Sequence, residues 1–384
     1  MADLRLRARQ AVELVKGSFA PLKDPRVART RYHPLLNILV FALTGALCGA
    51  NGWDELAAFA KAKQALFKGL LRMPRGTPSA DTFRRVFGAL HARTFEACFM
   101  SWVASLREAL AGKVVAFDGK AVKGTVERTA RGGAEFLHLL HAWVSDSHLL
   151  LAQEAVEGSP GEARALPGLI RTLDVEGAVV TADANGCTAA VAEACTQSGA
   201  DYALALKGNR GALYTQTLEA FDEVGLHPFG TFVSHDMGHG REEYRRISAL
   251  PLTHWPLKGP RWAGARTVVR VERTRRGDVQ ATLDVHYYLT SLPADDCEAL
   301  ARVIRTHWGV ENGLHWVLDV AFAEDRRPIR DKTAAQNWGL VQRMALNLLK
   351  RDTTSKLGIA AKRKQAGWDD AYLLHLLTLE ITKN

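Results

Sequence analysis

Two short apolar runs, each closed by an aspartate, constrain the fold of this chain more than any other feature. The runs are VVAFD at 114–118 and VVTAD at 179–183, and Gly or Asn follows each of them closely. Apolar runs this short, bounded by turn-forming residues, are typical of buried strands. Two neighbouring parallel strands would hold Asp118 and Asp183 side by side at their carboxyl ends, where open α/β sheets place their sites. The pattern therefore predicts an α/β fold with paired carboxylates.

A third acidic residue stands in the segment 307–325, HWGVENGLHWVLDVAFAED, which we predict to be helical. Val310, Leu314 and Val317 recur at i, i+4 and i+7 and would share one apolar face. Glu311 would lie beside that face, where a carboxylate is costly to bury unless it meets a cation. A helix packed on the sheet in this way would add a third carboxylate to the two aspartates.

The balance of charge favours a polyanionic partner. The 384 residues suffice for two or three domains and carry a formal net charge of +9. Nucleic acid is the first candidate for such a partner, although solubility alone would also explain the charge. Residues 326–364 hold eleven Lys or Arg against two Asp. A strip this basic suits a phosphate backbone, or is a solvated helix.

Cysteine usage and the N-terminus indicate a reducing compartment. The five cysteines are widely spaced and include no Cys-x-x-Cys pair, which indicates neither a disulfide framework nor a cysteine-type zinc site. The basic N-terminus lacks the apolar core of a signal peptide. The most apolar run, 35–48, is too short to span a bilayer and predicts a core helix. We therefore expect a cytoplasmic protein with no membrane partner.

The order of predicted elements divides the chain. Residues 1–110 are predicted to form an all-helical domain, and residues 111–384 an α/β domain. Within the second, a strand and a hairpin are followed by helix, strand, helix and strand, which is the order of the ribonuclease H-like fold. Residues at about 210–293 interrupt this order with strand-like runs and Gly-rich turns, which predict a β-rich insertion.

One predicted helix in the first domain carries paired arginines. The sequence TPSADTFRRVFGAL spans 77–90, where Pro78 and Ser79 suit a helix start. Arg84 and Arg85 would lie off its apolar stripe. A short helix entered through a tight turn and bearing such a pair resembles a DNA-reading helix, although an ordinary solvated face would look the same.

Three converging carboxylates predict a site for Mg²⁺ and for phosphoryl transfer. Mg²⁺ prefers oxygen ligands and is usually held by a few carboxylates and substrate phosphate. Two such ions about 3.5–4 Å apart clamp both the attacking and the leaving oxygen. Cationic side chains nearby could neutralise phosphate charge. The candidates are Lys120, Lys207, His239, Arg241 and His307.

Other roles are open for single residues. His307, Glu311 and His315 fall at i, i+4 and i+8 and could form a zinc site, but they lack the His-Glu-x-x-His spacing. His315 could equally be a core residue with a satisfied polar tip, which we favour. Taken singly, Asp118 and Asp183 could be strand-end residues that cap turns. Only the combination favours catalysis.

Five motifs follow one another along the chain: VVAFDGKAVKGT, VVTADANGC, YALALKGNRGAL, HGREEYRR and HWGVENGLHWVLDVAFAED. In this order and spacing they resemble the DDE transposases of bacterial insertion sequences, in the branch that includes the H-repeat-associated proteins. The segment DPRVARTRYHPLLNILVFALTGALCGANGWDELAAFA resembles the N-terminal domain of that branch. The resemblance thus covers nearly the whole chain.

This resemblance implies a fold, an activity and partners. It implies an RNase H-like catalytic domain with a β-rich insertion, and Mg²⁺-dependent cleavage and transfer of DNA strands, with Mn²⁺ able to substitute. Asp118, Asp183 and Glu311 would be the catalytic and metal-binding acids. The expected partners are element ends and target DNA, bound by a homodimer or larger assembly at the bacterial nucleoid. The expected DNA contacts are Arg84, Arg85, Lys120, Lys207, Asn209, His239, Arg241, His307 and Asn312.

Four positions depart from related sequences. Thr188 stands where this branch usually has Gln. Ile304, His307 and Leu318 stand where related transposases have Tyr, Arg and Lys. The His and the absent Lys look normal for this branch. We favour an active transposase over a non-catalytic DNA-binding protein derived from one, because the three acids are present. A metal-dependent DNA nuclease without strand joining is the other alternative.

Overall fold

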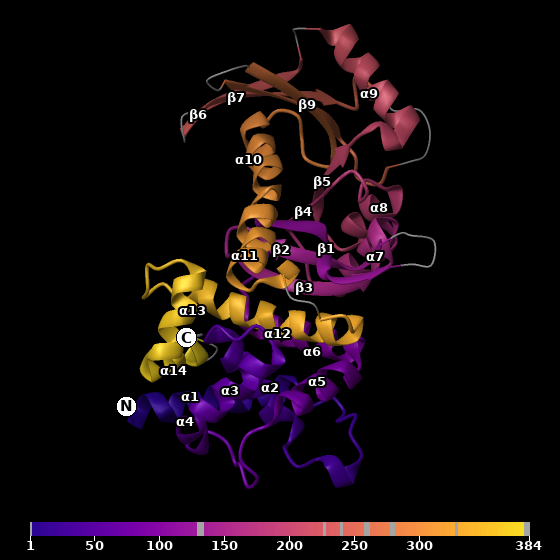
Figure 1. The fold of residues 1–384 in the computed structure, drawn as a ribbon. Coiled ribbons are helices and arrows are strands. Elements are labelled where there is room, and N and C mark those ends of the chain that lie inside the picture. The colour runs from indigo at the N-terminus through magenta and orange to yellow at the C-terminus, as the bar shows by residue number, and fades with distance from the viewer. Residues whose placement is uncertain are drawn as a thin grey trace.

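The computed structural model describes residues 2–128, 134–225, 228–238, 241–256, 262–276, 281–326 and 329–379. Helices form both ends of the chain and lie together at one end of the molecule, and the nine-stranded sheet extends away from them (Figure 1). Of the expected DNA contacts, His239 and the side chain of Arg241 lie outside the described part.

The centre of the sheet holds the two strands predicted from the runs that end in aspartate. In the order β3-β2-β1-β4-β5-β9-β8-β7-β6, strand β4 is parallel to β1 and to β5, and the other neighbours are antiparallel. Phe117 of β1 pairs with Ala182 of β4. The next residues, Asp118 and Asp183, therefore lie at the same end of this parallel pair, as predicted. The elements are β1 (Val114–Arg128), β2 (Ala134–Val144), β3 (Leu149–Val156), α7 (Gly158–Thr172), β4 (Val179–Ala182), α8 (Ala189–Gln197), β5 (Asp201–Leu206) and η2 (Gly208–Arg210).

The segment expected as a β-rich insertion extends this sheet. It begins with a helix, α9, which the sequence did not predict, and continues in four strands. Leu204 of β5 pairs with Leu289 of β9 in an antiparallel register. The four strands therefore continue the central sheet instead of forming a separate one. The elements are α9 (Gly211–Val224), β6 (Gly230–Gly238), β7 (Arg241–Pro251), β8 (Thr267–Arg276) and β9 (Ala281–Thr290).

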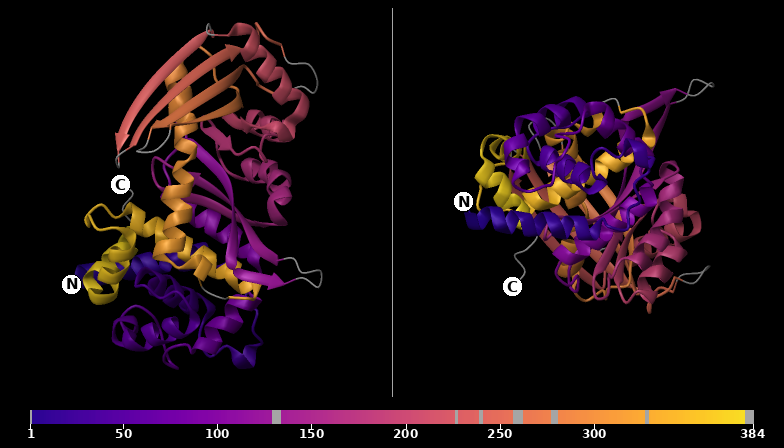
Figure 2. Two further views of the ribbon diagram at one scale, coloured as in Figure 1. Left: turned by 45° about the horizontal axis from the view of Figure 1, so that its top comes forward. Right: turned by 90° about the horizontal axis from the view of Figure 1, so that it is seen from below.

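A line of helical segments runs from the insertion to the helices at the other end of the molecule (Figures 1 and 2). The segments are α10 (Cys297–His307), the π-helical turn η3 (Glu311–His315), α11 (Trp316–Ala321) and η4 (Glu324–Arg326). Val310, Leu314 and Val317 are buried on one face, which confirms the predicted apolar stripe. Glu311 is exposed beside that face. The predicted helix is thus interrupted by a π turn that begins at this glutamate.

Helices from the two ends of the chain share one core. Helix α12 packs on α2, α5 and α6, and α14 packs on α1. Asn337 of α12 donates hydrogen bonds to the carbonyl oxygens of Phe87 and Leu90, where α5 ends. The N-terminal helices are α1 (Ala2–Ser18), η1 (Ala28–Thr30), α2 (Leu35–Leu47), α3 (Trp53–Ala62), α4 (Gln64–Lys68), α5 (Ala80–Ala89) and α6 (Ala92–Leu106). The C-terminal helices are α12 (Lys332–Arg351), α13 (Ile359–Trp368) and α14 (Asp370–Thr378).

Helix α2 is buried almost throughout, as predicted for a core helix. Within the described ranges, no helix combines the length and the apolar character that a membrane span requires.

The basic strip at 326–364 is not a phosphate-binding surface throughout. Arg343, Lys362 and Arg363 are buried. The first two form buried ion pairs, and Arg363 donates hydrogen bonds to backbone oxygens of α2 and α11. For these three cations the expectation of a phosphate contact is wrong, because their charges hold the C-terminal helices in place.

Candidate functional site

Asp118 lies within β1 at the point where the strand leaves its parallel partner. Burial raises the pKa of its carboxyl group to about 6. The charges of Asp183 and Glu311 add to this shift. A bound cation would favour the ionised form of a carboxyl group in this setting.

Asp183 follows β4 in a turn that orients its carboxylate. Its Oδ1 accepts hydrogen bonds from the backbone N–H groups of Asn185 at 2.9 Å and Gly186 at 3.2 Å. This is the turn-capping role that a strand-end aspartate commonly plays. The charge of Asp183 also raises the pKa of Asp118. Asp183 therefore acts on Asp118 through its charge, but it is not one of the three described residues, Asp118, Glu311 and His315, whose ligand atoms lie within 4.8 Å of one another.

Glu311 stands at the first position of the π turn, and the ring of His315 lies between its carboxylate and that of Asp118. Its Oε2 lies 3.3 Å from His315 Nδ1, and Asp118 Oδ2 lies 3.5 Å from the same nitrogen. One ligand atom from each of these three residues lies within 4.8 Å of the others. The hydrogen bond from His315 lowers the pKa of Glu311. Single π turns inside helices are frequent at functional sites.

Glu162 of α7 is a fourth carboxylate at this place, which sequence reasoning missed. It lies against Gly119, where any Cβ would collide with its carboxylate. Burial, and then the charges of Asp183 and Asp118, raise the pKa of Glu162 to about 7. A glutamate near the start of a helix is ordinary in sequence. The one signal was the glycine that directly follows Asp118, since glycine in a strand often marks a close approach.

His307 is not part of the acidic group in the portion of the chain that the structure describes. Its Nδ1 lies 3.0 Å from Thr181 Oγ1, and burial lowers its pKa to about 4. The ring is therefore neutral at pH 7 and supplies no charge to a phosphate. The geometry does not support a zinc site made of His307, Glu311 and His315. His315 is buried, as expected of a core residue.

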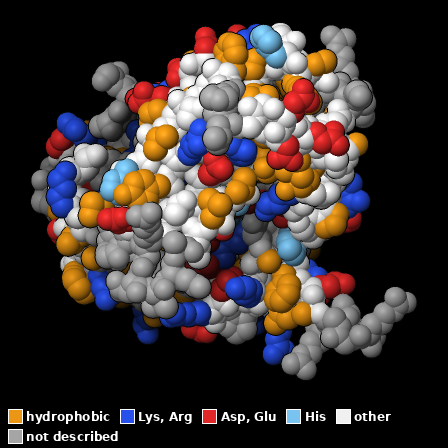
Figure 3. All heavy atoms as spheres, turned by 90° about the horizontal axis from the view of Figure 1, so that it is seen from above, with side chains coloured by type: hydrophobic (Ala, Val, Ile, Leu, Met, Phe, Trp, Pro, Cys, Tyr) orange, Lys and Arg blue, Asp and Glu red, His pale blue; other side chains and the backbone are white. Residues whose placement is uncertain are grey.

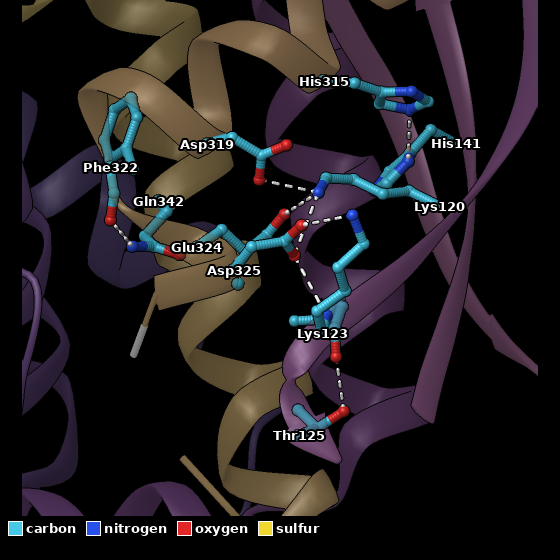
Figure 4. A network of polar contacts seen from close by, with 12 residues as sticks. Lys120, Lys123, Thr125, His141, His315, Asp319, Phe322, Glu324, Asp325 and Gln342 are labelled. Atoms are coloured by element: carbon cyan, nitrogen blue, oxygen red, sulfur yellow. Dashed lines mark hydrogen bonds and ion pairs between the residues drawn. The ribbon is translucent and has the colours of Figure 1, made fainter. Parts of the chain in front are cut away.

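Lys120 is an internal cation and not a surface contact for DNA. Its Nζ lies 2.7 Å from Asp319 Oδ1, 3.3 Å from Asp325 Oδ1 and 3.6 Å from Glu324 Oε2 (Figure 4). Its side chain is only 7% exposed. Burial alone would lower the pKa of Lys120, but the three carboxylates raise it. The expectation of a phosphate contact is therefore corrected, because this charge is already neutralised inside the fold.

The other expected DNA contacts that the structure describes are exposed. Arg84 and Arg85 project from α5 and share the carboxylate of Asp81. Lys207 and Asn209 follow β5, and Asn312 follows Glu311 in the π turn. The side-chain amide of Asn209 donates to the backbone oxygen of Ala184, directly after Asp183. Lys207, Asn209 and Asn312 therefore stand next to elements that carry the acidic site.

A cleft of about 760 Å³ separates the inner face of the β6–β9 sheet from α10 and reaches Glu311 and Asn312. Apolar side chains such as Ile247, Val271 and Tyr288 line it. The basic residues that line it are Arg245, Arg273, Arg275, Arg302 and Arg305. Several of these arginines already pair with acidic residues of the strands. Figure 3 likewise shows basic and acidic side chains intermixed at this end of the molecule, without one large basic field.

The donor set of the acidic site fits a hard divalent cation. Asp118, Asp183 and Glu311 offer carboxylate oxygens, the ligands that Mg²⁺ and Mn²⁺ prefer. The thiol of Cys187, the cysteine nearest to Asp183 in sequence, is buried, and burial raises its pKa to about 12, so it is not ionised as a thiolate ligand must be. The described residues whose ligand atoms lie together, Asp118, Glu311 and His315, thus offer carboxylate oxygens and one imidazole nitrogen.

Comparison with known proteins gives a consistent result. The sequence family described as "Transposase DDE domain" matches residues 110–348, and "DDE_Tnp_1-associated" matches residues 17–103. An "Uncharacterized protein in dhlA 3'region" of Xanthobacter autotrophicus is 38% identical over 286 residues, 73% of this chain and 95% of that protein. "Putative transposase YncI" of Escherichia coli O157:H7 is 31% identical, over 90% of this chain and 89% of its own length. "H repeat-associated putative transposase YhhI" of Escherichia coli K12 is 30% identical, over 90% and 92%.

Proposed function

This chain belongs to the transposase DDE domain family, and on that premise we propose that it is a metal-dependent DNA transposase. It binds the terminal inverted repeats of its element, hydrolyses a phosphodiester and joins the exposed 3′-hydroxyl to target DNA. The observation that carries this proposal is the approach of Glu311 to Asp118, from a helical turn far away in sequence.

The strand order supports an RNase H-like catalytic domain. Strands β1 to β3 form an antiparallel unit, and β4 and β5 add in parallel next to β1. We assign catalysis to residues 111–384, with the insertion at about 210–293, and DNA binding to the helices of residues 1–110. The C-terminal helices of the catalytic part pack on the N-terminal helices, so the two parts form one core.

Asp118, Asp183 and Glu311 are the residues that would hold Mg²⁺, for which Mn²⁺ could substitute. Two bound ions would stabilise the attacking and the leaving oxygen of the phosphodiester. The protein's own part is to hold the carboxylates in position: β1 and β4 fix the two aspartates, and the π turn aims the glutamate. No nucleophilic side chain is needed, since water or a DNA 3′-hydroxyl attacks.

Contact with DNA is assigned to exposed residues on two sides of the site. Arg84 and Arg85 on α5 would read the element ends, and Lys207, Asn209 and Asn312 would hold the strand near the acids. Asn337 links α12 to the carboxyl end of α5, so the DNA-reading helix is fixed to the catalytic part. The active form would be a homodimer or larger assembly on DNA.

Incubation of the purified protein with Mg²⁺ or Mn²⁺ and DNA that carries the flanking element ends tests the proposal. Cleavage at the ends followed by joining to a second DNA supports it. Cleavage without joining would identify a nuclease. Specific binding without cleavage in either metal would identify a non-catalytic DNA-binding protein.

A further inference from the structure

A chain of hydrogen bonds leads from the interior of the protein to the acidic site. Arg343 of α12 lies fully buried and donates to His141 Nε2, from Nε at 3.3 Å and from Nη2 at 3.1 Å. His141 of β2 is also buried, and its Nδ1 lies 3.4 Å from His315 Nε2 (Figure 4). His315 Nδ1 in turn lies 3.3 Å from Glu311 Oε2 and 3.5 Å from Asp118 Oδ2.

The order of donors and acceptors fixes where each ring carries its proton. A guanidinium group only donates, so His141 Nε2 must accept and carries no proton. A neutral imidazole has one N–H, which in His141 is therefore on Nδ1. Burial, and then Arg343, lower the pKa of His141 well below its usual value, which keeps the ring neutral. The Nδ1–H of His141 donates to His315 Nε2, so His315 must carry its own proton on Nδ1.

We propose that Arg343, acting through His141, holds His315 as an Nδ1–H donor that positions the carboxylates of Glu311 and Asp118. His315 is thus a positioning residue and does not bind the metal through Nδ1, because a protonated ring nitrogen has no lone pair for a cation. The donor lies between two negative groups, lowers their repulsion and sets their separation. This inference extends the proposed function, and the role of His315 in metal binding rests on that function.

Arg343, the residue at the interior end of this series of hydrogen bonds, is held in place by contacts of its own. Arg343 Nη1 donates to Glu324 Oε1 and to the carbonyl oxygen of Gly339. Glu324 in turn pairs with Lys120, the cation that the sequence assigned to DNA. Groups that orient metal ligands from behind are often worth about 10–100-fold in metal affinity. Lys120 and Arg343, the buried cations of β1 and α12, thus share Glu324 behind the acidic site, and Arg343 is linked to that site by His141 and His315.

Proton positions can be measured directly by NMR. Protein labelled with ¹⁵N-histidine would be studied without metal by long-range ¹H–¹⁵N correlation, and the variants His141→Asn and His315→Asn would assign the two rings. The expected result is a proton on Nδ1 in both His141 and His315. A proton on Nε2 of His315 would overturn the proposal. This measurement needs neither DNA nor activity, so its outcome is independent of the proposed function.

Metal affinity tests the positioning role. His141→Leu removes the donor to His315 but leaves Asp118, Glu311 and His315 in place. We expect the Mn²⁺ dissociation constant, measured by titration calorimetry, to rise about 10-fold or more. Arg343→Lys, which keeps the charge beside Glu324 but loses the guanidinium fork, should act in the same direction. His138→Leu, three residues earlier on β2, is the matched control and should leave affinity unchanged.

The outcomes distinguish a failure of the positioning role from a failure of the proposed metal-dependent function. An unchanged dissociation constant in a folded His141→Leu protein would contradict the positioning role. Failure of the wild-type protein to bind Mn²⁺ would contradict the proposed function instead, while the NMR result would still decide the hydrogen-bond chain.

Discussion

The carboxylate of Glu162 occupies the space in which a side chain at Gly119 would begin. Glu162 stands in α7, and Gly119 directly follows Asp118 on β1. The glycine is thus required by the close approach of a helix residue and not by an unusual backbone conformation. Any larger residue at position 119 must displace a carboxylate whose pKa is raised by two of the proposed metal ligands, Asp183 and Asp118.

Gly119→Ala must push the Glu162 carboxylate aside, and because this group is the far end of a flexible side chain, the free energy of unfolding should fall by no more than about 1 kcal/mol, the low end for an overpacked site. Glu162→Ala in the same chain should recover much of that loss, since it removes the colliding group. Urea denaturation of the two single variants and the double variant measures the coupling. Gly168→Ala on α7 is the control, because nothing lies within 4 Å of its Cβ position. If Glu162→Ala changed the stability of the wild type and of Gly119→Ala by the same amount, the predicted collision would be contradicted.

The pH dependence of stability should reveal the raised pKa of Asp118. Its carboxyl group has a pKa of about 6 in the folded protein, against 3.8 for an ordinary aspartate. The folded state thus binds the proton more tightly, so stability falls as pH rises through this window. Asp118→Asn should therefore stabilise the metal-free protein at pH 8 by about 1–3 kcal/mol. The gain should vanish below pH 4.

Thermal unfolding in the presence of a chelator measures this effect. Asp319→Asn is the matched control, since Asp319 accepts a hydrogen bond from Lys120 at 2.7 Å and its neutralisation should destabilise the protein. If Asp118→Asn instead destabilised the protein at pH 8, the Asp118 carboxylate would be favourably paired in the metal-free state, which would contradict its raised pKa.

Lys120 should matter for folding and not for DNA affinity. Lys120→Met leaves three carboxylates without their shared cation, which should cost about 3–5 kcal/mol. Lys123→Met is the control: Lys123 is exposed and lies 3.8 Å from Asp325, so its loss should cost about 0–1 kcal/mol. Urea unfolding gives both values. If Lys120→Met were as stable as the wild type but bound DNA more weakly, the DNA contact predicted from sequence would be supported and the structural role contradicted.

Binding of duplex DNA should weaken steeply with salt, because phosphate contacts release counterions. Replacement of Arg84 and Arg85 by Ala should reduce the preference for element ends more than general binding, if α5 reads bases. The control is Arg7→Ala on α1, since Arg7 pairs with Asp3 at i,i+4 much as Arg85 pairs with Asp81. Fluorescence anisotropy at several salt concentrations measures both properties. If the double variant lost affinity equally for element ends and for random DNA, α5 would contact the phosphate backbone of the DNA and not its bases.

The central strands and the acids on them could be predicted from sequence, because their signals are local. The runs that end at Asp118 and Asp183 are short and apolar, and short apolar runs fit buried strands. The apolar spacing around Glu311 likewise predicted which face of that helix is buried. The π turn could not be predicted, because the same spacing suits an uninterrupted helix.

The contacts around these acids could not be predicted, because they join residues far apart in the chain. Lys120 stands two residues after Asp118, which suggested a role at the phosphate. Its partners Asp319 and Asp325 come from about 200 positions later. Glu162 reaches the site only because α7 packs over β1. Sequence spacing gives no information on such pairings, which depend on how the helices pack on the sheet.

Cleavage of end-bearing DNA by Glu311→Gln, measured in Mg²⁺ beside its thermal unfolding, decides whether the three acids form a catalytic metal site. The change removes one negative charge from the proposed metal site and nearly keeps the shape of the side chain. Metal ligands act as a unit, so most cleavage should be lost, and addition of Asp118→Asn or Asp183→Asn should lower it little further. The melting temperature of the metal-free protein should fall only slightly, because the Glu311 carboxylate accepts a hydrogen bond from His315 but is exposed. Cleavage at the wild-type rate with a lowered melting temperature would show that Glu311 supports the fold and does no chemistry.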